Sequence, residues 1–196
     1  MKIETLEVAG FRSAVRAVRL PHNKPALNEG HYKVNNAIDE GEITYSASVG
    51  FGEKDINLMK TLAKRGDEHA KVLRGIIVWA EITAPIYFWS EMETYRIGHE
   101  RLSSESTMHG VAKGLTGEEL VRVKSELPMG TELKKVDYFS YQTLRRIVSQ
   151  RNTHRLPQWH MFIDWVRTLP MAEQLIFDGT NVAFKEEDEN VYIENK

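Results

Sequence analysis

A buried strand that runs directly into a proline-led helix most constrains how this chain can fold. Residues 74–83 contain the consecutive apolar residues Ile76, Ile77, Val78 and Trp79. The shortness of this run and its β-branched side chains favour a strand with little solvent exposure. Pro85 ends the strand and suits the first turn of a helix, where a missing N–H costs no helical hydrogen bond. The pattern predicts a helix from Pro85 to about Ser103.

Hydrophobic periodicity predicts further elements on both sides of this junction. Residues 2–9 alternate between apolar and polar side chains, which indicates a strand closed by Gly10. Helices are predicted over residues 54–65, 116–126 and 138–150, and from Pro157 onward. Thr116 and Glu119 have the spacing of a capping box, whereas residues 21–52 have no clear pattern and are not placed. The elements together predict an α+β fold with helices packed on a modest antiparallel sheet.

Length and composition are those of one globular domain. Of the 196 residues, 41% are hydrophobic and 28% are charged, so we expect a single domain over residues 1–180. Residues 181–196 are acidic and predict an edge strand or a tail. The net charge of −2 gives no general attraction to nucleic acid or anionic membranes, and no apolar run approaches the ~20 residues of a membrane span. We therefore expect a cytoplasmic protein without nucleic-acid or membrane partners.

The segment after the predicted strand resembles the signature of a known family. Residues 84–107 read APIYFWSEMETYRIGHERLSSEST. This is similar to flavin-dependent thymidylate synthases, which carry Ala-Pro-Ile and then a motif R-H-R-x-x-S-x-N-E-x-S-x-R. Aligned without gaps, the Arg-His-Arg triplet falls on Thr94, Tyr95 and Arg96, and the later motif residues fall on His99, Arg101, Leu102, Ser104 and Ser106. Only Arg96 and Ser104 keep the residue of the family.

Flanking segments extend the resemblance to roughly the central and C-terminal two thirds of the chain. Counting back from Ala84 places the flavin-facing histidine of the family on His69. Downstream, a Leu-Pro pair at residues 127–128 precedes a helix that ends at Arg151, with spacing similar to the family. The resemblance implies the flavin-dependent thymidylate synthase fold and a homotetramer whose nucleotide sites are shared between subunits. We expect an apolar stripe on the last helix to pack across subunits; its members are Trp159, Phe162, Ile163 and Val166.

The resemblance also implies which residues form the site. The residues implied to bind a pyrimidine deoxynucleotide are Ser104, Lys124, Arg151 and Glu91. Those implied to contact the flavin are His69, Arg96 and Tyr95. Arg151 is the implied catalytic residue, because a planar guanidinium can grip a phosphate or a carbonyl edge with two hydrogen bonds. Without the resemblance, Arg151 is more typical of a solvated basic helix end, and Ser104 and Lys124 are equally typical of ordinary surface positions.

The implied activity is the transfer of a one-carbon unit from a folate donor to carbon 5 of the pyrimidine, with FAD as cofactor. The absence of cysteine agrees with this activity, because the unrelated thymidylate synthases attack the base with a cysteine thiolate. FAD binding is expected to be weak or lost, because each missing charge-assisted contact costs ~1.5–3 kcal/mol. The positions that replace flavin-binding residues of the family are Thr94, Tyr95, Ser140 and Gln142, and the arginines that could compensate are Arg74, Arg101 and Arg146.

Two functions therefore remain open. The first is a flavin-dependent thymidylate synthase-like transferase, and the second is a catalytically inactive protein that senses or sequesters a nucleotide on the same fold. A purely structural oligomer would explain the rewritten motif but not the retained arginine and lysine. No metal site is predicted, because His99-Glu100 lacks the second histidine of a zinc-binding helix.

Overall fold

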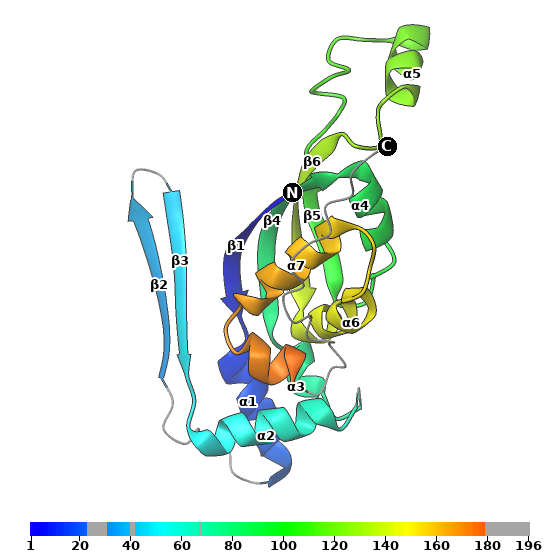
Figure 1. The fold of residues 1–196 in the computed structure, drawn as a ribbon. Helices are drawn as coiled ribbons and strands as arrows, with labels where there is room; N and C mark the ends of the chain where they lie inside the picture. The colour runs from blue at the N-terminus through cyan, green and yellow to red at the C-terminus, as the bar shows by residue number, and fades with distance from the viewer. Residues whose placement is uncertain (23–30, 40–41, 67, 179–196) are drawn as a thin grey trace, which may run out of the picture.

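A four-stranded antiparallel sheet forms the centre of the protein in the computed structural model (Figure 1). The structure describes residues 1–22, 31–39, 42–66 and 68–178. The strands lie in the order β1 (Lys2–Ala9), β4 (Ile77–Pro85), β6 (Glu132–Ser140) and β5 (His99–Ser104). A second, two-stranded sheet consists of β2 (His31–Asp39) and β3 (Glu42–Gly50), within the segment that the sequence did not place. The predicted α+β class with an antiparallel sheet is confirmed.

The central strand β4 is the strand predicted around the apolar run. Its inward-facing residues Val78, Ala80 and Ile82 have no exposed surface, and their neighbours along the strand are partly exposed. β4 pairs with β1 on one side and with β6 on the other, so its backbone hydrogen bonds are satisfied along both edges. The strand begins later than predicted, because residues 71–74 form the short helix α3 (Lys71–Arg74).

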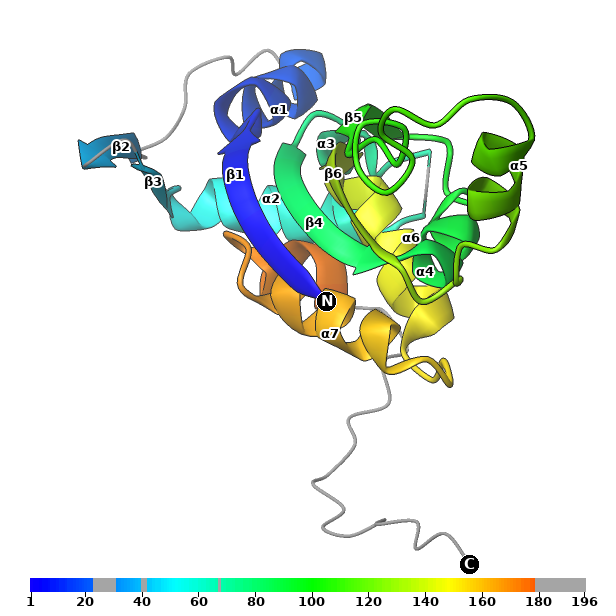
Figure 2. The same ribbon diagram turned by 90° about the horizontal axis from the view of Figure 1, so that it is seen from above.

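Helices cover one face of this sheet. They are α4 (Ile86–Met92), α6 (Tyr141–Arg151), α7 (Pro157–Arg167) and the short helix η2 (Glu173–Phe177). Figures 1 and 2 both show α6 and α7 on the same side of the strands. The apolar stripe of α7 is buried within the chain, where the Phe162 ring contacts the rings of Phe88 and Phe139. The expectation that this stripe packs between subunits is therefore wrong, because it already forms the core of one subunit.

Two further helices close the end of the sheet at which β1 finishes. α1 (Phe11–Arg19) follows β1 through Gly10, and α2 (Glu53–Lys64) lies close to it, joined by a buried ion pair between Arg19 and Asp55. Gly10 has φ 94, and a Cβ built there would lie 1.8 Å from the carbonyl oxygen of Gly75. Glycine is therefore required at this turn both for its backbone conformation and for the close approach of α3.

The helix predicted over residues 85–103 is wrong in its second half. α4 ends at Met92, and the chain then turns into the edge strand β5. Gly98 has φ 73, a conformation that interrupts a right-handed helix. A Cβ at this glycine would lie 2.5 Å from the hydroxyl oxygen of Ser140, so the turn passes closely over the start of α6. The close passage brings β5 into register beside β6.

The helix predicted over residues 138–150 also begins too early. Residues up to Ser140 continue β6, and the Ser140 hydroxyl accepts a hydrogen bond from the backbone N–H of Thr143, which caps α6. Thr116 does occupy the N-cap of α5 (Gly117–Ser125), but its side chain makes no capping hydrogen bond, so the predicted capping box is wrong. The helix predicted from Pro157 is confirmed, with the proline in its first turn.

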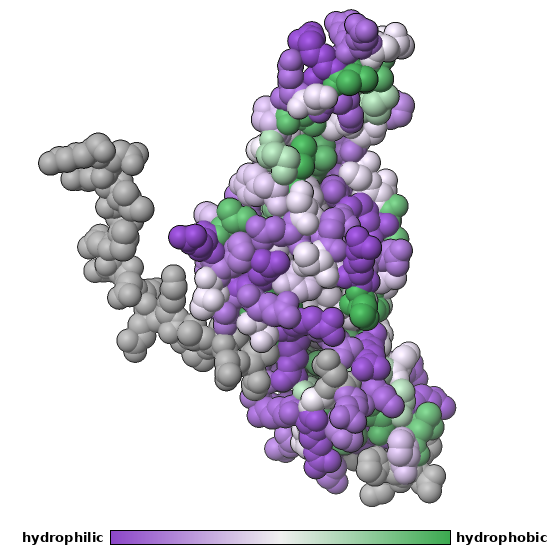
Figure 3. Space-filling view, turned by 90° about the vertical axis from the view of Figure 1, so that its right-hand side faces the viewer, coloured by the Kyte–Doolittle hydropathy of each residue, from purple (hydrophilic) through white to green (hydrophobic). Residues whose placement is uncertain are grey.

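The segment that carries α5 projects beyond the sheet (Figure 1). No residue of α5 is buried, and the segment exposes the apolar residues Met108, Val111, Val121 and Met129. Figure 3 shows apolar side chains among hydrophilic ones over this end of the molecule. The predicted acidic segment 181–196 lies outside the described residues. Within the described ranges, no helix is long and apolar enough to cross a membrane.

Candidate functional site

Polar side chains from three helices meet at Glu91, in the last turn of α4. Its Oε2 atom accepts a hydrogen bond from Arg151 Nη1 at 3.0 Å and one from Trp159 Nε1 at 2.8 Å. Arg151 ends α6 and Trp159 lies in the first turn of α7, so one carboxylate joins all three helices. Trp159 is fully buried, whereas the Glu91 side chain is 31% exposed. The carboxylate therefore lies at the boundary between the core and the solvent.

The His154 ring lies close to the same carboxylate oxygen. Its Nδ1 atom accepts a hydrogen bond from the backbone N–H of Leu156 at 3.2 Å. Because Nδ1 acts as an acceptor, the hydrogen-bond network assigns the ring proton to Nε2, which lies 3.3 Å from Glu91 Oε2. A neutral imidazole can therefore donate to Glu91. The loop between α6 and α7 thus contributes to the same cluster as the two helices that it connects.

Arg151 is held in one orientation by these neighbours. Its Nε atom donates to the hydroxyl oxygen of Tyr95 at 2.8 Å. The guanidinium carbon lies 4.6 Å from the centre of the Trp159 ring and 5.5 Å from that of Tyr95, within cation–π range of both. Among the described residues, its hydrogen bonds use Nε and Nη1 only. The side chain is 17% exposed, and Nη2 makes no hydrogen bond to the described residues.

A second polar cluster adjoins the first through Tyr95. The backbone oxygen of Tyr95 lies 2.8 Å from His99 Nδ1, and the carboxylate of Asp137 lies 2.7 Å from His99 Nε2. Both ring nitrogens thus face acceptors, a geometry that suits an imidazolium, which donates from both. The ring also stacks on Phe139, with centroids 4.5 Å apart and planes inclined by 4°. Asp137 itself is fully buried.

Arg101 lies on the solvent side of this second cluster. Its Nε donates to Asp137 Oδ1 at 3.3 Å, and its Nη1 donates to the Glu93 carboxylate. The hydrogen bond from Arg101 lowers the pKa of Glu93 below its ordinary value. Burial, followed by the charge of Arg101, lowers the pKa of Lys135. A cavity of about 290 Å³ opens beside this cluster; its lining residues are Glu93, Tyr95, Arg96, His99, Glu100 and Arg101.

Four of the residues expected from the sequence lie in this region. Arg151 donates hydrogen bonds to both Glu91 and Tyr95. Arg96 is exposed and lines the neighbouring cavity, and its Nε donates to the backbone oxygen of Glu93 at 3.2 Å. Tyr95 is almost fully buried and its hydroxyl accepts from Arg151, so its side chain is already used within the subunit.

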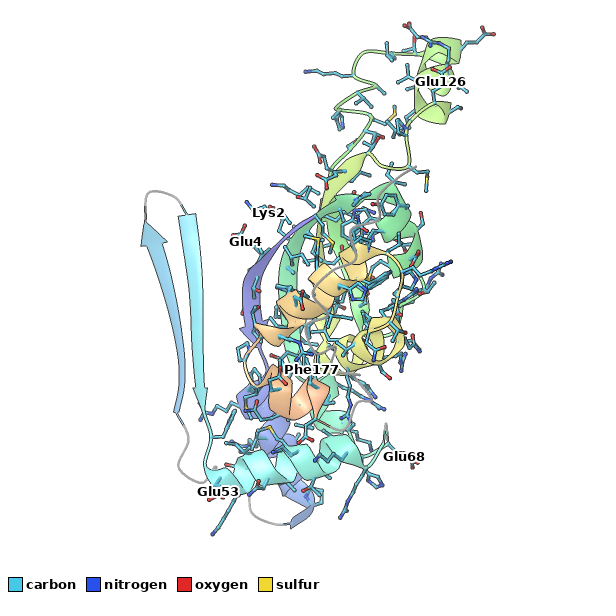
Figure 4. The ribbon with its side chains drawn as sticks, in the orientation of Figure 1. Lys2, Glu4, Glu53, Glu68, Glu126 and Phe177 are labelled. Carbon is cyan, nitrogen blue, oxygen red and sulfur yellow. The ribbon has the colours of Figure 1, made fainter. Side chains whose placement is uncertain are left out.

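The other three expected residues lie elsewhere in the subunit. Ser104 is exposed at the end of β5, where its hydroxyl donates to the backbone oxygen of Glu105. Lys124 donates to the Thr107 hydroxyl on the projecting α5 segment. His69 is exposed and follows Glu68, which lies at the opposite end of the molecule from Glu126 (Figure 4). It lines an apolar cavity of about 530 Å³ between α1 and the segment after α2. One subunit therefore does not bring these residues to Arg151.

Sequence analysis did not find the His99–Asp137 pair. His99 lies in a segment predicted as helix, and Asp137 lies in a strand that was not predicted. Lys135, Asp137 and Phe139 are the buried positions of this strand, and two of them are charged residue types, so the sequence shows no apolar alternation there. The contact of His154 with Glu91 depends on the geometry of the loop between α6 and α7, which the sequence pattern does not predict.

The residues at the family's flavin-binding positions make hydrogen bonds within the chain. Ser140 caps α6, and Gln142 accepts a hydrogen bond from Arg74 Nε at 2.8 Å. Arg101, the second arginine expected to compensate, is bonded to carboxylates of its own cluster. Within the described ranges, no group of three or more histidine, aspartate or glutamate side chains could hold a metal ion.

Comparison with solved structures identifies the fold. The chain superimposes on thymidylate synthase X (ThyX) from Helicobacter pylori with FAD and dUMP, with a TM-score of 0.67 and 13% identity over 92% of this chain and 100% of that one. A second structure of ThyX from Helicobacter pylori, complexed with FAD and dUMP, gives a TM-score of 0.65 at 13% identity, covering 92% and 99% of the two chains. The UMP/dUMP methylase PolB from Streptomyces cacaoi, bound with 5-Br dUMP, gives 0.61 at 12% identity, covering 92% and 96%.

Comparison of sequences adds no relative. No protein-family model matches the chain, and no curated protein matches it. At 12–13% identity the structural likeness establishes the fold and leaves the activity open. The chain therefore has a flavin-dependent thymidylate synthase-like fold, as its sequence motifs implied.

Proposed function

We propose that this protein binds a pyrimidine deoxynucleotide at Arg151 and transfers a one-carbon unit to carbon 5 of its base. The observation that carries the proposal is the fixation of Arg151 by Glu91 and Tyr95, with one guanidinium nitrogen left for a ligand. A guanidinium held in this way loses little freedom when it binds, so its hydrogen bond to a base or phosphate is preorganised. Similar folds that hold dUMP support this choice of ligand class.

The proposed site draws residues from more than one subunit. Arg151 would orient the base and polarise it, with Glu91 holding the arginine. Ser104 and Lys124 would hold the nucleotide of a neighbouring subunit, because they lie away from Arg151 in their own. The proposal therefore requires an oligomer, and a homotetramer is the form that the resemblance implies. The single-domain organisation over residues 1–180 is part of the same proposal.

FAD does not fit the described residues of one subunit. Arg96 and His69 are exposed but line different cavities, and the side chain of Tyr95 is used by Arg151. A flavin site would have to be completed by a second subunit. The resemblance implies FAD and a folate donor for the proposed transfer, and the absence of a cysteine nucleophile agrees with this.

A second candidate is a nucleotide-binding protein that no longer catalyses the transfer. The observation that favours it is the use of the flavin-side positions within the chain, with Ser140 capping a helix and Gln142 bound by Arg74. Purification distinguishes the two functions, because a transferase that retains FAD shows flavin absorption in visible light. A colourless protein that is still stabilised by nucleotides would support the binding function.

The experiment that tests the shared part of both functions is a thermal shift with deoxypyrimidine monophosphates. Binding to the folded state raises the melting temperature. Arg151→Ala should remove most of the shift, because a lost charged contact costs ~1.5–3 kcal/mol. Arg155→Ala is the matched control, since Arg155 is exposed just beyond α6. Equal behaviour of the two variants, or no shift of the wild type at ligand concentrations of about 1 mM, a regime of very weak binding, would show that the proposed site is wrong.

A further inference from the structure

Three backbone oxygens in the turn between α4 and β5 are held by three different groups. The oxygens of Ile97 and Gly98 accept from a hydroxyl and a backbone N–H at the N-terminal end of α6, at 2.6 and 2.7 Å. The oxygen of Tyr95 lies 2.8 Å from Nδ1 of the His99 ring. A hydroxyl and a peptide N–H keep their proton at every ordinary pH, whereas an imidazole exchanges one in the physiological range. Of these three contacts, the one to Tyr95 is therefore the one that pH can break.

The other nitrogen of the His99 ring also needs a proton. Nε2 lies 2.7 Å from Oδ2 of Asp137, whose side chain is fully buried. A neutral imidazole has a single N–H, and the buried carboxylate is the stronger acceptor, because hydrogen bonds to charged groups are the stronger ones. A neutral ring would therefore keep its bond to Asp137. The lone pair of Nδ1 would then face the lone pairs of the Tyr95 oxygen at close range, and this contact would become repulsive.

The charges around the ring suit an imidazolium. Asp137 on β6 and Glu93 after α4 are both carboxylates, and Arg101 on β5 donates to both of them. A charged His99 balances the second negative charge, as buried carboxylates require. Lys135 on β6 is the other cation that interacts with these carboxylates, but burial, followed by the charge of Arg101, lowers its pKa, so it holds its proton less firmly than an ordinary lysine.

Tyr95 connects this turn to Arg151. Its side chain is almost fully buried, and its ring packs edge-on against Trp159 with the centroids 5.9 Å apart. Its hydroxyl oxygen accepts from Arg151 Nε at 2.8 Å. The backbone oxygen and the hydroxyl are the two ends of one rigid residue, and close packing leaves that residue little room to adjust. A displacement of the Tyr95 backbone therefore reaches the guanidinium of Arg151 through the ring.

We propose that the His99–Asp137 pair positions Arg151 for nucleotide binding by holding Tyr95, and that it does so only while the His99 ring carries both of its protons. Loss of one proton releases the Tyr95 oxygen and with it the orientation of Arg151, so nucleotide binding weakens as the pH rises. The pair acts through Tyr95 and is a positioning pair. Its effect on binding rests on the nucleotide site proposed at Arg151, whereas its effect on the Arg151 side chain does not. The family motif has a serine at the aligned position, so this pair is a feature of this chain.

Two substitutions of His99 separate its two contacts. Glutamine places an amide N–H near the position of Nε2 and can keep the bond to Asp137. Asparagine is shorter and places its amide N–H near the position of Nδ1, toward the Tyr95 oxygen. In calorimetric titrations with dUMP at about pH 6, where an ordinary imidazole is mostly protonated, His99→Gln should bind several-fold more weakly than the wild type and His99→Asn should bind nearly as well.

His109→Gln is the control for these variants, because His109 is exposed on the segment that carries α5. It should bind dUMP as the wild type does, and all variants should keep a cooperative melting transition. Wild-type affinity in His99→Gln, or weaker binding by His99→Asn than by His99→Gln, would overturn the proposal.

The pH dependence of the wild type tests the role of the proton. From about pH 6 to about pH 9, a range that includes the titration of ordinary imidazoles, the wild type should lose affinity several-fold and approach the affinity of His99→Gln. The ionisation of the dUMP phosphate is common to both proteins and cancels in the ratio of their affinities. A ratio that stays constant over this range would overturn the proposal.

The Nε–H signal of Arg151 in heteronuclear NMR spectra tests the same coupling without a nucleotide. This signal is assigned by its absence from Arg151→Ala. It should shift together with the nitrogen signals of the His99 ring as the pH rises, and in His99→Gln it should occupy the shifted position at every pH. An Arg151 signal that does not follow His99 would overturn the coupling, whether or not dUMP binds. A signal that follows His99 in a protein that binds no nucleotide would support the coupling and show that the proposed function is wrong.

Discussion

Replacement of Glu91 by glutamine separates the stability of the Arg151 cluster from its ability to bind a ligand. Glu91 Oε2 accepts from Arg151 at 3.0 Å and from Trp159 at 2.8 Å, and His154 Nε2 lies at 3.3 Å. Glutamine keeps one acceptor oxygen, so the Trp159 bond can persist. It removes the negative charge that faces Arg151 and leaves a partly buried guanidinium without its counter-ion.

The magnitude follows from the type and burial of these contacts. A hydrogen bond between charged groups contributes ~1.5–3 kcal/mol, and one between neutral groups ~0.5–1.5 kcal/mol. The Arg151 and Glu91 side chains are 17% and 31% exposed, so solvent screens part of the difference. We expect Glu91→Gln to lower the free energy of unfolding by ~1–2 kcal/mol, or the melting temperature by roughly 2–8 °C for a chain of this size.

Nucleotide binding should change in the opposite direction. Without the Glu91 charge, the field of Arg151 is no longer neutralised, and a phosphate-bearing ligand should bind more tightly. A gain of ~1 kcal/mol corresponds to about a fivefold lower Kd, because 1.4 kcal/mol is a factor of ten. Deoxyuridine, which has no phosphate, should show little change. Calorimetric titration with dUMP and deoxyuridine measures both effects.

The control is Glu118→Gln on α5, where the glutamate is exposed. This variant should change neither stability nor affinity by a measurable amount. A Glu91→Gln protein as stable as the wild type would show that the contacts of the Glu91 carboxylate do not hold the three helices together. Weaker dUMP binding by a correctly folded Glu91→Gln protein would show that the fixation of Arg151 by Glu91 matters more for binding than the charge that Glu91 neutralises.

Four further outcomes test the fold and its assembly. Light scattering at micromolar concentration should give the mass of a homotetramer, and a mass near 22.6 kDa would exclude a site shared between subunits. Titration of FAD, followed by quenching of its fluorescence, should show weak binding, and submicromolar affinity would contradict the loss of the flavin contacts. Gly10→Ala should destabilise the protein by more than ~2 kcal/mol, because the new Cβ would overlap the Gly75 carbonyl oxygen. Gly66→Ala is the control and should cost only ~1–2 kcal/mol, because Gly66 has a positive φ but open space around it. Equal losses of stability in chemical denaturation would refute the close approach at Gly10. Lys135→Met should raise stability at neutral pH by ~1 kcal/mol, since a buried ammonium that has no ion-pair partner among the described residues is replaced by an apolar chain of similar length. The pKa of Lys135 is lower in the folded state than in the unfolded state, so between the folded-state pKa and 10.5 the unfolded state binds more protons. The wild type therefore gains stability as the pH rises through this window, and the stability advantage of Lys135→Met should shrink. A stability advantage that grows with pH would contradict the lowered pKa.

Local side-chain patterns were sufficient to predict the elements in which apolar residues repeat with a regular period. The strand over residues 2–9, the buried strand before Pro85 and the helix from Pro157 were all predicted within a few residues. Each of these segments shows its environment in its own pattern, because a buried face selects apolar residues at a fixed spacing. The motif spacing also led to Arg151 and to the fold, since those blocks keep their order along the chain.

The strands β5 and β6, and the polar cluster between them, could be recognised only in the folded protein. Their inward positions carry the ionisable residues His99, Arg101 and Asp137. Such residues normally indicate solvent, and they are tolerated inside only because residues 36 and 38 apart along the chain neutralise one another. Hydrophobic periodicity is local, whereas this pairing exists only after β5 and β6 have come together. For the same reason, the contact of His99 with the Tyr95 oxygen became visible only when the neighbours of His99 in space were known.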